Sequence, residues 1–147
     1  MAKLRYDVDA TIPAERFMAA LTDFSERRPT IWPGLSASLF NVHELGATWA
    51  DVTEGTDIAG GVWARERYDW STPGVVTLTL IDSADFQPGT ITAYRVTSRP
   101  DGCHIQVDFH RIARSLRGRL VGVAVQSFGA RRFADELATA VARLGGA

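Results

Sequence analysis

Hydrophobic and polar residues alternate at the start of the chain. One face of residues 4–12 carries Leu4, Tyr6, Val8, Ala10 and Ile12, and the positions between them are charged or polar. A period of two residues is typical of a half-buried β-strand. The pattern therefore predicts that the chain opens with a strand over residues 4–12.

The period changes after Pro13, a residue that is well tolerated at the beginning of a helix. Three apolar residues follow at helical spacing, namely Phe17, Leu21 and Phe24. A second short helical segment is expected over residues 25–31, before the turn signal Trp32-Pro33-Gly34. The strand should thus lead into two short helices.

From residue 34 to about residue 112, turn signals that contain Gly or Pro recur at fairly regular intervals. The segments between them are rich in β-branched and aromatic residues. In Val75–Ile81, for example, Val76, Leu78 and Leu80 alternate with threonines. This arrangement predicts an antiparallel meander of about six strands, or about seven with the first strand.

The last 30 or so residues return to a helical period. One face collects Leu116, Leu120, Val123, Ala130, Ala134, Leu137 and Val141, and charged residues lie roughly opposite. One long amphipathic helix is expected, ended by Gly145-Gly146. Its first half should be apolar nearly all round, because Val121, Val125 and Phe128 occupy the face that is charged further along.

Glycines recur along one edge of this predicted helix, at Gly118, Gly122 and Gly129. A glycine inside a helix costs about 1 kcal/mol relative to Ala, so some gain must offset it. Close packing against the sheet is one explanation. Room for a ligand and a surface for self-association are the others.

Composition fits a single domain over residues 1–147. Hydrophobic residues make up 46% of the chain, which suffices for a sizeable core. A net charge of −1 argues against a nucleic-acid partner. One basic run stands out, at Arg111, Arg114, Arg117 and Arg119; it fits a solvated loop or a site for an anionic head group.

A cytoplasmic location is expected. The N-terminal residues lack the apolar core of a signal peptide, and no stretch is long and apolar enough for stable membrane insertion. Cys103 is the one cysteine, which rules out an intrachain disulfide. The three histidines lack metal-ligand spacing, and no phosphate loop or nucleophile motif is present, so neither a metal nor another cofactor is expected.

The order of elements and three stretches of sequence resemble the START-like (SRPBCC) superfamily. The stretches are Ile12–Phe17, Val62–Trp70 and Arg117–Leu120. This superfamily includes the birch pollen allergens, lipid-transfer START domains and polyketide cyclases and dehydratases, and the chain looks most like its bacterial polyketide-cyclase-like branch. The resemblance implies an α+β helix-grip fold, a curved antiparallel sheet wrapped around the C-terminal helix. It also implies a hydrophobic small-molecule guest between sheet and helix.

Alternation within Val62–Trp70 turns Ala64, Glu66, Tyr68 and Trp70 inward and the arginines outward. Glu66 is then a carboxylate on an apolar face, and a buried charge without a partner is costly. Glu66 is thus a candidate anchor for a ligand hydroxyl or a candidate general acid or base. The alternative is a structural ion pair with Arg111, which falls inward together with Phe109. Trp63 falls outward, where an arginine can stack on it.

The other candidate ligand-binding residues are large or apolar side chains. They are Trp32, Tyr68, Trp70, Tyr94, Phe109, Val121 and Val125. Tyrosines would provide a ring wall with a polar tip, and Trp32 would lie at the pocket mouth. Each of these aromatic residues is equally explained as part of an ordinary core.

Three functions fit the sequence. The first is a binder of a lipid, polyketide or aromatic metabolite. The second is a cyclase or dehydratase in which Glu66 transfers a proton while Tyr68, Tyr94 or Arg111 polarises a carbonyl. The third is an interaction module, for instance a homodimer formed through Val121, Val125 and Phe128.

Overall fold

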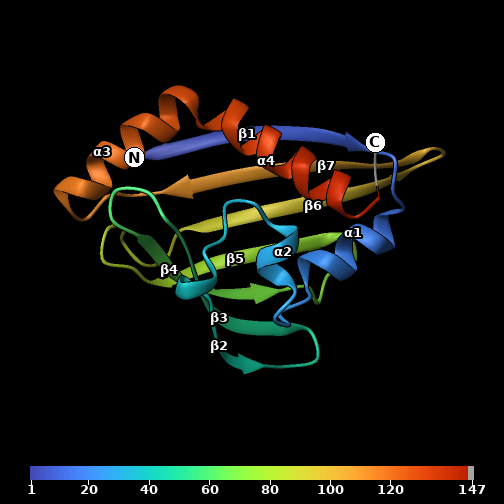
Figure 1. Cartoon of the computed structure of the whole chain (residues 1–147), viewed down its shortest axis with the longest axis horizontal. Helices are drawn as coiled ribbons and strands as arrows, with labels where there is room; N and C mark the ends of the chain where they lie inside the picture. Colours follow the sequence, from blue (N-terminus) through green and yellow to red (C-terminus); the bar gives the residue numbers. More distant parts are fainter. Residues whose placement is uncertain (146–147) are drawn as a thin grey trace.

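The computed structural model describes residues 1–145. Its main feature is one curved seven-stranded antiparallel sheet in the order β1-β7-β6-β5-β4-β3-β2 (Figure 1). The strands are β1 (Ala2–Ala10), β2 (Asn41–Leu45), β3 (Trp49–Thr56), β4 (Val62–Asp69), β5 (Val75–Asp82), β6 (Ile91–Arg99) and β7 (Gly102–Arg111). The first strand pairs with the last, and the other strands follow one another as a meander. The predicted first strand and six-strand meander are confirmed.

The helices lie over the inner, concave side of this sheet. They are α1 (Ala14–Leu21), α2 (Arg28–Ile31), the 3-10 turn η1 (Ala37–Leu39), α3 (Leu116–Ala124), the π-helical turn η2 (Val125–Gly129) and α4 (Ala130–Arg143). The last three run on from one another, and η2 and α4 pack along β1 (Figure 1). The two short helices are confirmed, although α2 is only one turn long and carries Pro29 in its first turn.

The core fills the space between the sheet and the helices α1 and α4. Phe17 on α1, Ile105 and Val107 on β7, and Leu137 and Val141 on α4 are almost completely buried. Strand β1 shows the predicted alternation, with its charged side chains on the solvent face. The sheet and α4 therefore form one apolar interior, as the sequence periods indicate.

The predicted long C-terminal helix is confirmed, but the face predicted to be buried is wrong in its first half. Leu116, Leu120 and Val123 are 73%, 66% and 67% exposed, although the pattern places them on the buried face. The π-helical turn η2 is the cause, because a wider turn takes up an extra residue and rotates everything before it relative to α4. At the C-terminal end Gly145 has a left-handed φ of 95° and ends the helix as predicted, whereas Gly146 lies outside the described residues.

Two of the three helix glycines are explained by close packing. A Cβ on Gly118 would lie 2.1 Å from the backbone oxygen of Asp85, and one on Gly129 would crowd Val125 and Leu4. Gly122 faces open space instead. Among the described residues, no helix is long and apolar enough to cross a membrane.

Candidate functional site

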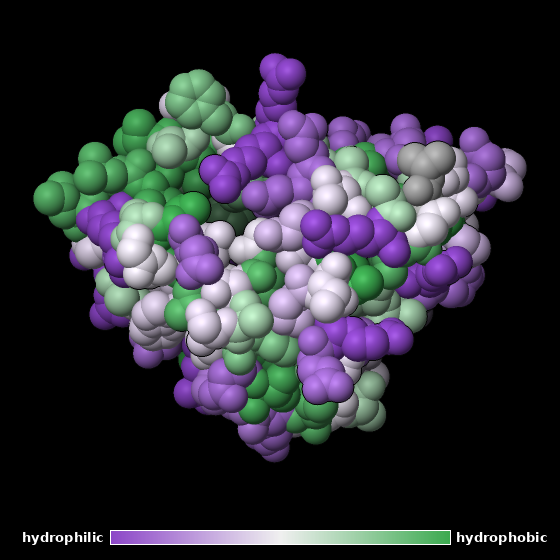
Figure 2. All heavy atoms as spheres, viewed as in Figure 1, coloured by the Kyte–Doolittle hydropathy of each residue, from purple (hydrophilic) through white to green (hydrophobic). Residues whose placement is uncertain are grey.

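A cavity of about 490 Å³ lies between the inner face of the sheet and the C-terminal helical segment. Its wall is mainly apolar and includes Trp32, Tyr68, Leu78, Phe109, Val121, Val125 and Phe133. Figure 2 shows a hollow on the surface beside the apolar side chains over α3 and the charged side chains of the C-terminal helix. Pockets that hold small molecules have this size and character.

Glu66 reaches the cavity from β4 and forms the ion pair with Arg111 of β7 that the alternation indicated. Its Oε2 accepts from Arg111 at 3.0 Å, and both side chains are less than 10% exposed. Arg111 also donates to Thr92 Oγ1 at 3.2 Å and to the backbone oxygen of His110 at 3.0 Å. Phe109 lies against the guanidinium, with 4.9 Å from ring centroid to Cζ.

The protonation of Glu66 reflects two opposing influences. Burial raises the pKa of the Glu66 carboxyl, and nearby Glu54 raises it further, while Arg111 offsets part of that rise. The net shift is upward. Glu66 can therefore exchange a proton closer to neutral pH than an exposed glutamate can.

A second buried cluster lies on the same cavity wall. Arg28 of α2 donates through Nε to Glu54 Oε2 at 2.7 Å, and the Tyr68 hydroxyl donates to the other oxygen of Glu54. Arg28 also donates to Tyr68 Oη at 3.2 Å and to the backbone oxygens of Leu21 and Asp23, both at 2.9 Å. The cluster fastens α1 and α2 to strands β3 and β4.

The pKa values of this cluster follow from its burial. Burial alone would lower the pKa of Arg28, but the Glu54 carboxylate and Tyr68 reverse that effect and raise it. Burial raises the pKa of Tyr68 well above its ordinary value, and Glu54 adds to the rise. Arg28 therefore stays charged, and Tyr68 remains a hydrogen-bond donor throughout the physiological range.

Two further tyrosines present neutral hydroxyls to the cavity. Tyr6 of β1 and Tyr94 of β6 both line it and lie close enough to influence each other. Burial raises the pKa of Tyr94 to about 12, and burial with Tyr94 alongside also raises the pKa of Tyr6. Both phenols thus stay protonated and can donate or accept one hydrogen bond.

Solved structures with the same architecture are known at low sequence identity. TTHA0849 from Thermus thermophilus has a TM-score of 0.78 and 14% identity over 97% of this chain and 96% of that chain. The Zhui aromatase/cyclase from Streptomyces has a TM-score of 0.75 and 14% identity over 97% and 93% of the two chains. A START superfamily protein from Mycobacterium smegmatis has a TM-score of 0.73 and 15% identity over 99% and 98%. The chain has the START-like helix-grip fold.

The evidence for the helix-grip assignment is structural, because no family model matches the chain and no curated protein resembles it in sequence. At 14–15% identity these likenesses establish the fold alone. They confirm the expected fold class. What the cavity holds must be argued from its own residues.

The predicted ligand-binding residues of the helix-grip cavity converge, with one exception. Trp32, Glu66, Tyr68, Tyr94, Phe109, Arg111, Val121 and Val125 all line the cavity. Trp70 does not: it faces inward as predicted and packs against the core, but at the end of β4 away from the cavity. Trp70 instead stacks on Phe24, with ring centroids 6.0 Å apart.

Trp32 lines the cavity through its indole ring, which meets Phe17 edge-on at a centroid distance of 6.0 Å. Its Nε1 is buried and has no hydrogen-bond partner among the described residues. Trp63 also contributes to the cavity wall, and the outer-face stacking expected of it is formed by Trp49, whose ring lies 4.3 Å from Cζ of Arg67. The expected stacking of an arginine on Trp63 is thus not among the described contacts, whereas the outward assignment of Trp63 stays a prediction.

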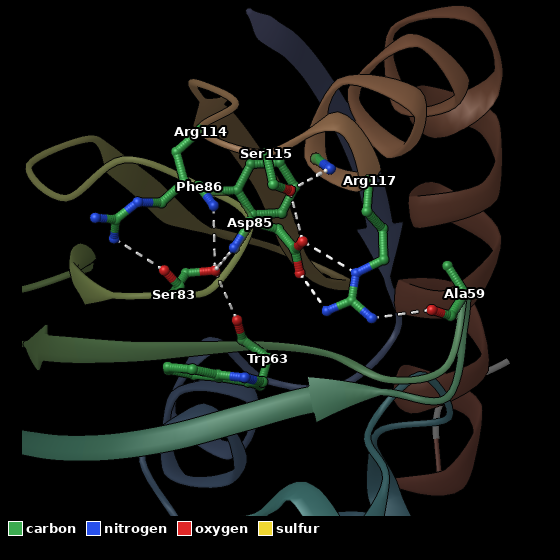
Figure 3. A network of polar contacts seen from close by, with 9 residues as sticks. Ala59, Trp63, Ser83, Asp85, Phe86, Arg114, Ser115 and Arg117 are labelled. Atoms are coloured by element: carbon green, nitrogen blue, oxygen red, sulfur yellow. Dashed lines mark hydrogen bonds and ion pairs between the residues drawn. The ribbon is translucent and has the colours of Figure 1, made fainter.

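The N-terminal end of helix α3 is held by polar contacts between Asp85, Ser115 and Arg117, called the clasp below (Figure 3). Asp85 follows β5 and is 2% exposed. Its carboxylate accepts from Arg117 Nε at 3.0 Å, from a terminal nitrogen of Arg117 at 2.7 Å and from Ser115 Oγ at 2.7 Å. Arg117 also donates to the backbone oxygen of Ala59 at 3.0 Å, so that three segments meet at this residue.

The expectation of a solvated basic loop is wrong for most of the run. Arg111 is buried against Glu66, Arg114 donates to the backbone oxygen of Ser83 at 3.0 Å, and Arg117 is part of the clasp. Only Arg119 is exposed with no ion pair among the described residues. The clasp and the second cluster were missed because Asp85 lies in an irregular segment and Arg28 in a helix of one turn, and neither has a period to interpret.

The three residues predicted to form a homodimer surface, Val121, Val125 and Phe128, all line the cavity, and Phe128 is also 75% exposed. The large exposed apolar side chains of α3 are instead Leu116, Leu120 and Val123. A homodimer through Val121, Val125 and Phe128 stays a prediction.

Proposed function

We propose that the protein binds a small, largely apolar molecule in the cavity between the sheet and the C-terminal helical segment. The observation that carries this proposal is the cavity itself. A cavity of about 490 Å³ that opens to the surface and is lined by aromatic and aliphatic side chains has the size and character of a small-molecule site. Trp32, Phe109, Val121 and Val125 would form its apolar walls.

The polar groups of the cavity would orient the guest. The described hydrogen bond of Glu66 uses Oε2, which leaves Oε1 as an acceptor on the cavity wall. Tyr94 and Tyr6 add two hydroxyls on the neighbouring strands. A few placed polar groups in an apolar pocket fix the orientation of a ligand more than they add to its affinity.

Two measurements test binding. Native mass spectrometry of the purified protein, followed by solvent extraction, would identify a molecule that copurifies with it. Titration with the neutral fluorescent probe N-phenyl-1-naphthylamine would give an affinity for an apolar guest.

Matched substitutions on one helix then locate the guest. Val121→Trp fills the cavity and should abolish the probe signal. Val123→Trp adds the same ring two residues away at a 67% exposed position and should leave the signal unchanged. Equal effects of the two substitutions, or no probe binding by a folded wild-type protein, would overturn the proposal.

Acid–base catalysis is a second candidate, favoured by the raised pKa of a carboxyl that lines the cavity. In a cyclase or dehydratase reaction Glu66 would transfer the proton, and Tyr68, Tyr94 or Arg111 would polarise the substrate carbonyl. If the wild-type protein converts a substrate, a Glu66→Gln variant that still binds this substrate but no longer converts it would support this role. Conversion at the wild-type rate by that variant would exclude it.

A further inference from the structure

The charged residues that line the cavity comprise equal numbers of cations and anions, and each cation forms an ion pair with one of the anions. Three are cations and three are anions, and they form the pairs Arg28–Glu54, Arg111–Glu66 and Arg132–Glu136, with N–O distances of 2.7, 3.0 and 3.3 Å. The third pair lies at the solvent-facing side, where Arg132 is 62% exposed. Every charge on the cavity wall thus has a counter-charge within the wall.

The two inner ion pairs, Arg28–Glu54 and Arg111–Glu66, are buried as well as balanced in charge. Arg28 is 3% exposed, and its described donors go to Glu54, Tyr68 and backbone oxygens. Arg111 is 9% exposed, and its described donors go to Glu66, Thr92 and a backbone oxygen. Each terminal nitrogen of the two guanidiniums thus already donates to a described acceptor, whereas Nε of Arg111 has no acceptor among the described residues.

A charged guest would therefore meet a neutral, poorly hydrated wall. A carboxylate would have to compete with Glu54 or Glu66 for an arginine that is already paired, and an ammonium group would have to compete with that arginine for the glutamate. Either exchange leaves a buried charge without a partner, which is strongly unfavourable. An uncharged guest breaks no pair and can still bond to Oε1 of Glu66 or to the tyrosine hydroxyls.

We propose that the cavity selects uncharged ligands that carry a hydroxyl or carbonyl group, and discriminates against carboxylates and amines with the same skeleton. This proposal rests on the proposed binding function and adds the chemical class of the ligand. The hydroxyl of such a ligand would donate to Glu66, and a carbonyl would accept from Tyr94 or Tyr6. Trp32, whose Nε1 is buried with no acceptor among residues 1–145, lines the same cavity.

Competition against N-phenyl-1-naphthylamine tests this selectivity in the full wild-type chain. The competitors are 2-naphthol, 2-naphthoate and 2-naphthylmethylamine at pH 7, where they are neutral, anionic and cationic. We expect the affinity for 2-naphthol to be at least about tenfold higher than the affinity for either charged analogue. Equal or tighter binding of the naphthoate would overturn the ligand class while leaving the binding function intact, whereas no binding of the probe would overturn the binding function.

One substitution should invert the preference. Glu66→Gln removes the counter-charge of Arg111 with little change in shape, so the ratio of naphthoate to naphthol affinity should rise about tenfold. The matched control Glu44→Gln removes an exposed carboxylate of β2 that does not line the cavity, so it should leave that ratio unchanged. An unchanged ratio in folded Glu66→Gln would contradict the proposal.

A second variant covers the case in which Glu66→Gln fails to fold. Arg111→Gln leaves Glu66 as the unpaired charge, so the same competition should now favour the naphthylmethylamine over the naphthoate. Circular dichroism of each variant establishes folding before the competition is read. A folded Arg111→Gln variant in which the ratio of naphthylmethylamine to naphthoate affinity does not rise above the wild-type ratio would equally contradict the proposal.

Discussion

Helices α3 and α4 are two parts of one helical segment, yet they are attached to the rest of the molecule by different means. Helix α4 buries Leu137, Ala140 and Val141 against the sheet. Helix α3 exposes Leu116, Leu120 and Val123 and is fastened by the polar clasp around Asp85 (Figure 3). The fold can thus keep a rigid core under α4 while the part of the helix over the cavity depends on a few directional contacts.

The same substitution in the two helices gives the largest expected contrast. Leu137→Ala removes a 4% exposed side chain and should lower the free energy of unfolding by about 2–5 kcal/mol, because the core around it refills only in part. Leu120→Ala removes a 66% exposed side chain and should change it by about 0.5 kcal/mol or less. Urea unfolding followed by circular dichroism measures both changes.

Helix propensity does not explain such a contrast, since both changes replace Leu by Ala. The contrast isolates burial on two parts of one segment. A loss of more than about 1 kcal/mol in Leu120→Ala would mean that α3 buries this side chain in solution, against a contact not formed in the single chain.

The contrast between α3 and α4 also shows where sequence periodicity is sufficient to assign a side chain to the buried face and where it is not. Alternation placed Glu66 and Arg111 on one face correctly, because both lie on regular strands. A uniform helical step failed at η2, since a π turn shifts the register without leaving a mark in the hydrophobic pattern. The sequence pattern therefore predicted the strands and helices and the buried face of α4, but not the orientation of α3.

The remaining part of the site depends on long-range contacts from irregular segments. Glu54 shares its parity on β3 with buried Ala50 and Val52, so alternation alone would have turned it inward. Arg28 has no such signal, because a helix of one turn has no face to identify. The partnership of Arg28 with Glu54, 26 residues away, becomes visible only in three dimensions.

A smaller effect should follow from loosening the clasp. Asp85→Asn keeps the shape of the side chain but removes the charge that holds Arg117, so α3 should lose about 1–3 kcal/mol of protection. Hydrogen–deuterium exchange should accelerate in Leu116–Ala124 and stay unchanged in Ala130–Arg143.

The control for this change is Arg132→Met, which breaks the solvent-facing ion pair with Glu136 on α4. Exposed pairs of this kind contribute little, so exchange in both helices should stay at the wild-type rate. Equal acceleration of α3 and α4 in Asp85→Asn would show that the two helices open as one unit, and the distinction between them would be lost.

Acidification should also distinguish the attachment of α3 from that of α4, and this is the smallest of the expected effects. The hydrogen bonds from Arg117, followed by those from Ser115, hold the pKa of Asp85 below its ordinary value of 3.8, although burial opposes the shift. A carboxyl with a lowered pKa in the folded state contributes stability above pH 3.8 and loses it as the pH falls through the folded pKa. The apolar attachment of α4 contains no titrating group at Leu137 or Val141.

Exchange in α3, corrected for the intrinsic pH dependence of amide exchange, should therefore accelerate as the pH falls below 3.8, and earlier than exchange in α4. Other carboxylates with lowered pKa values, such as Asp108, add a global loss of stability that both helices share. The comparison with Asp85→Asn separates the two contributions, because this variant lacks the titrating group and should show the same acid dependence in α3 and α4. If α3 keeps its own acid dependence in Asp85→Asn, a group other than Asp85 holds it against the cavity.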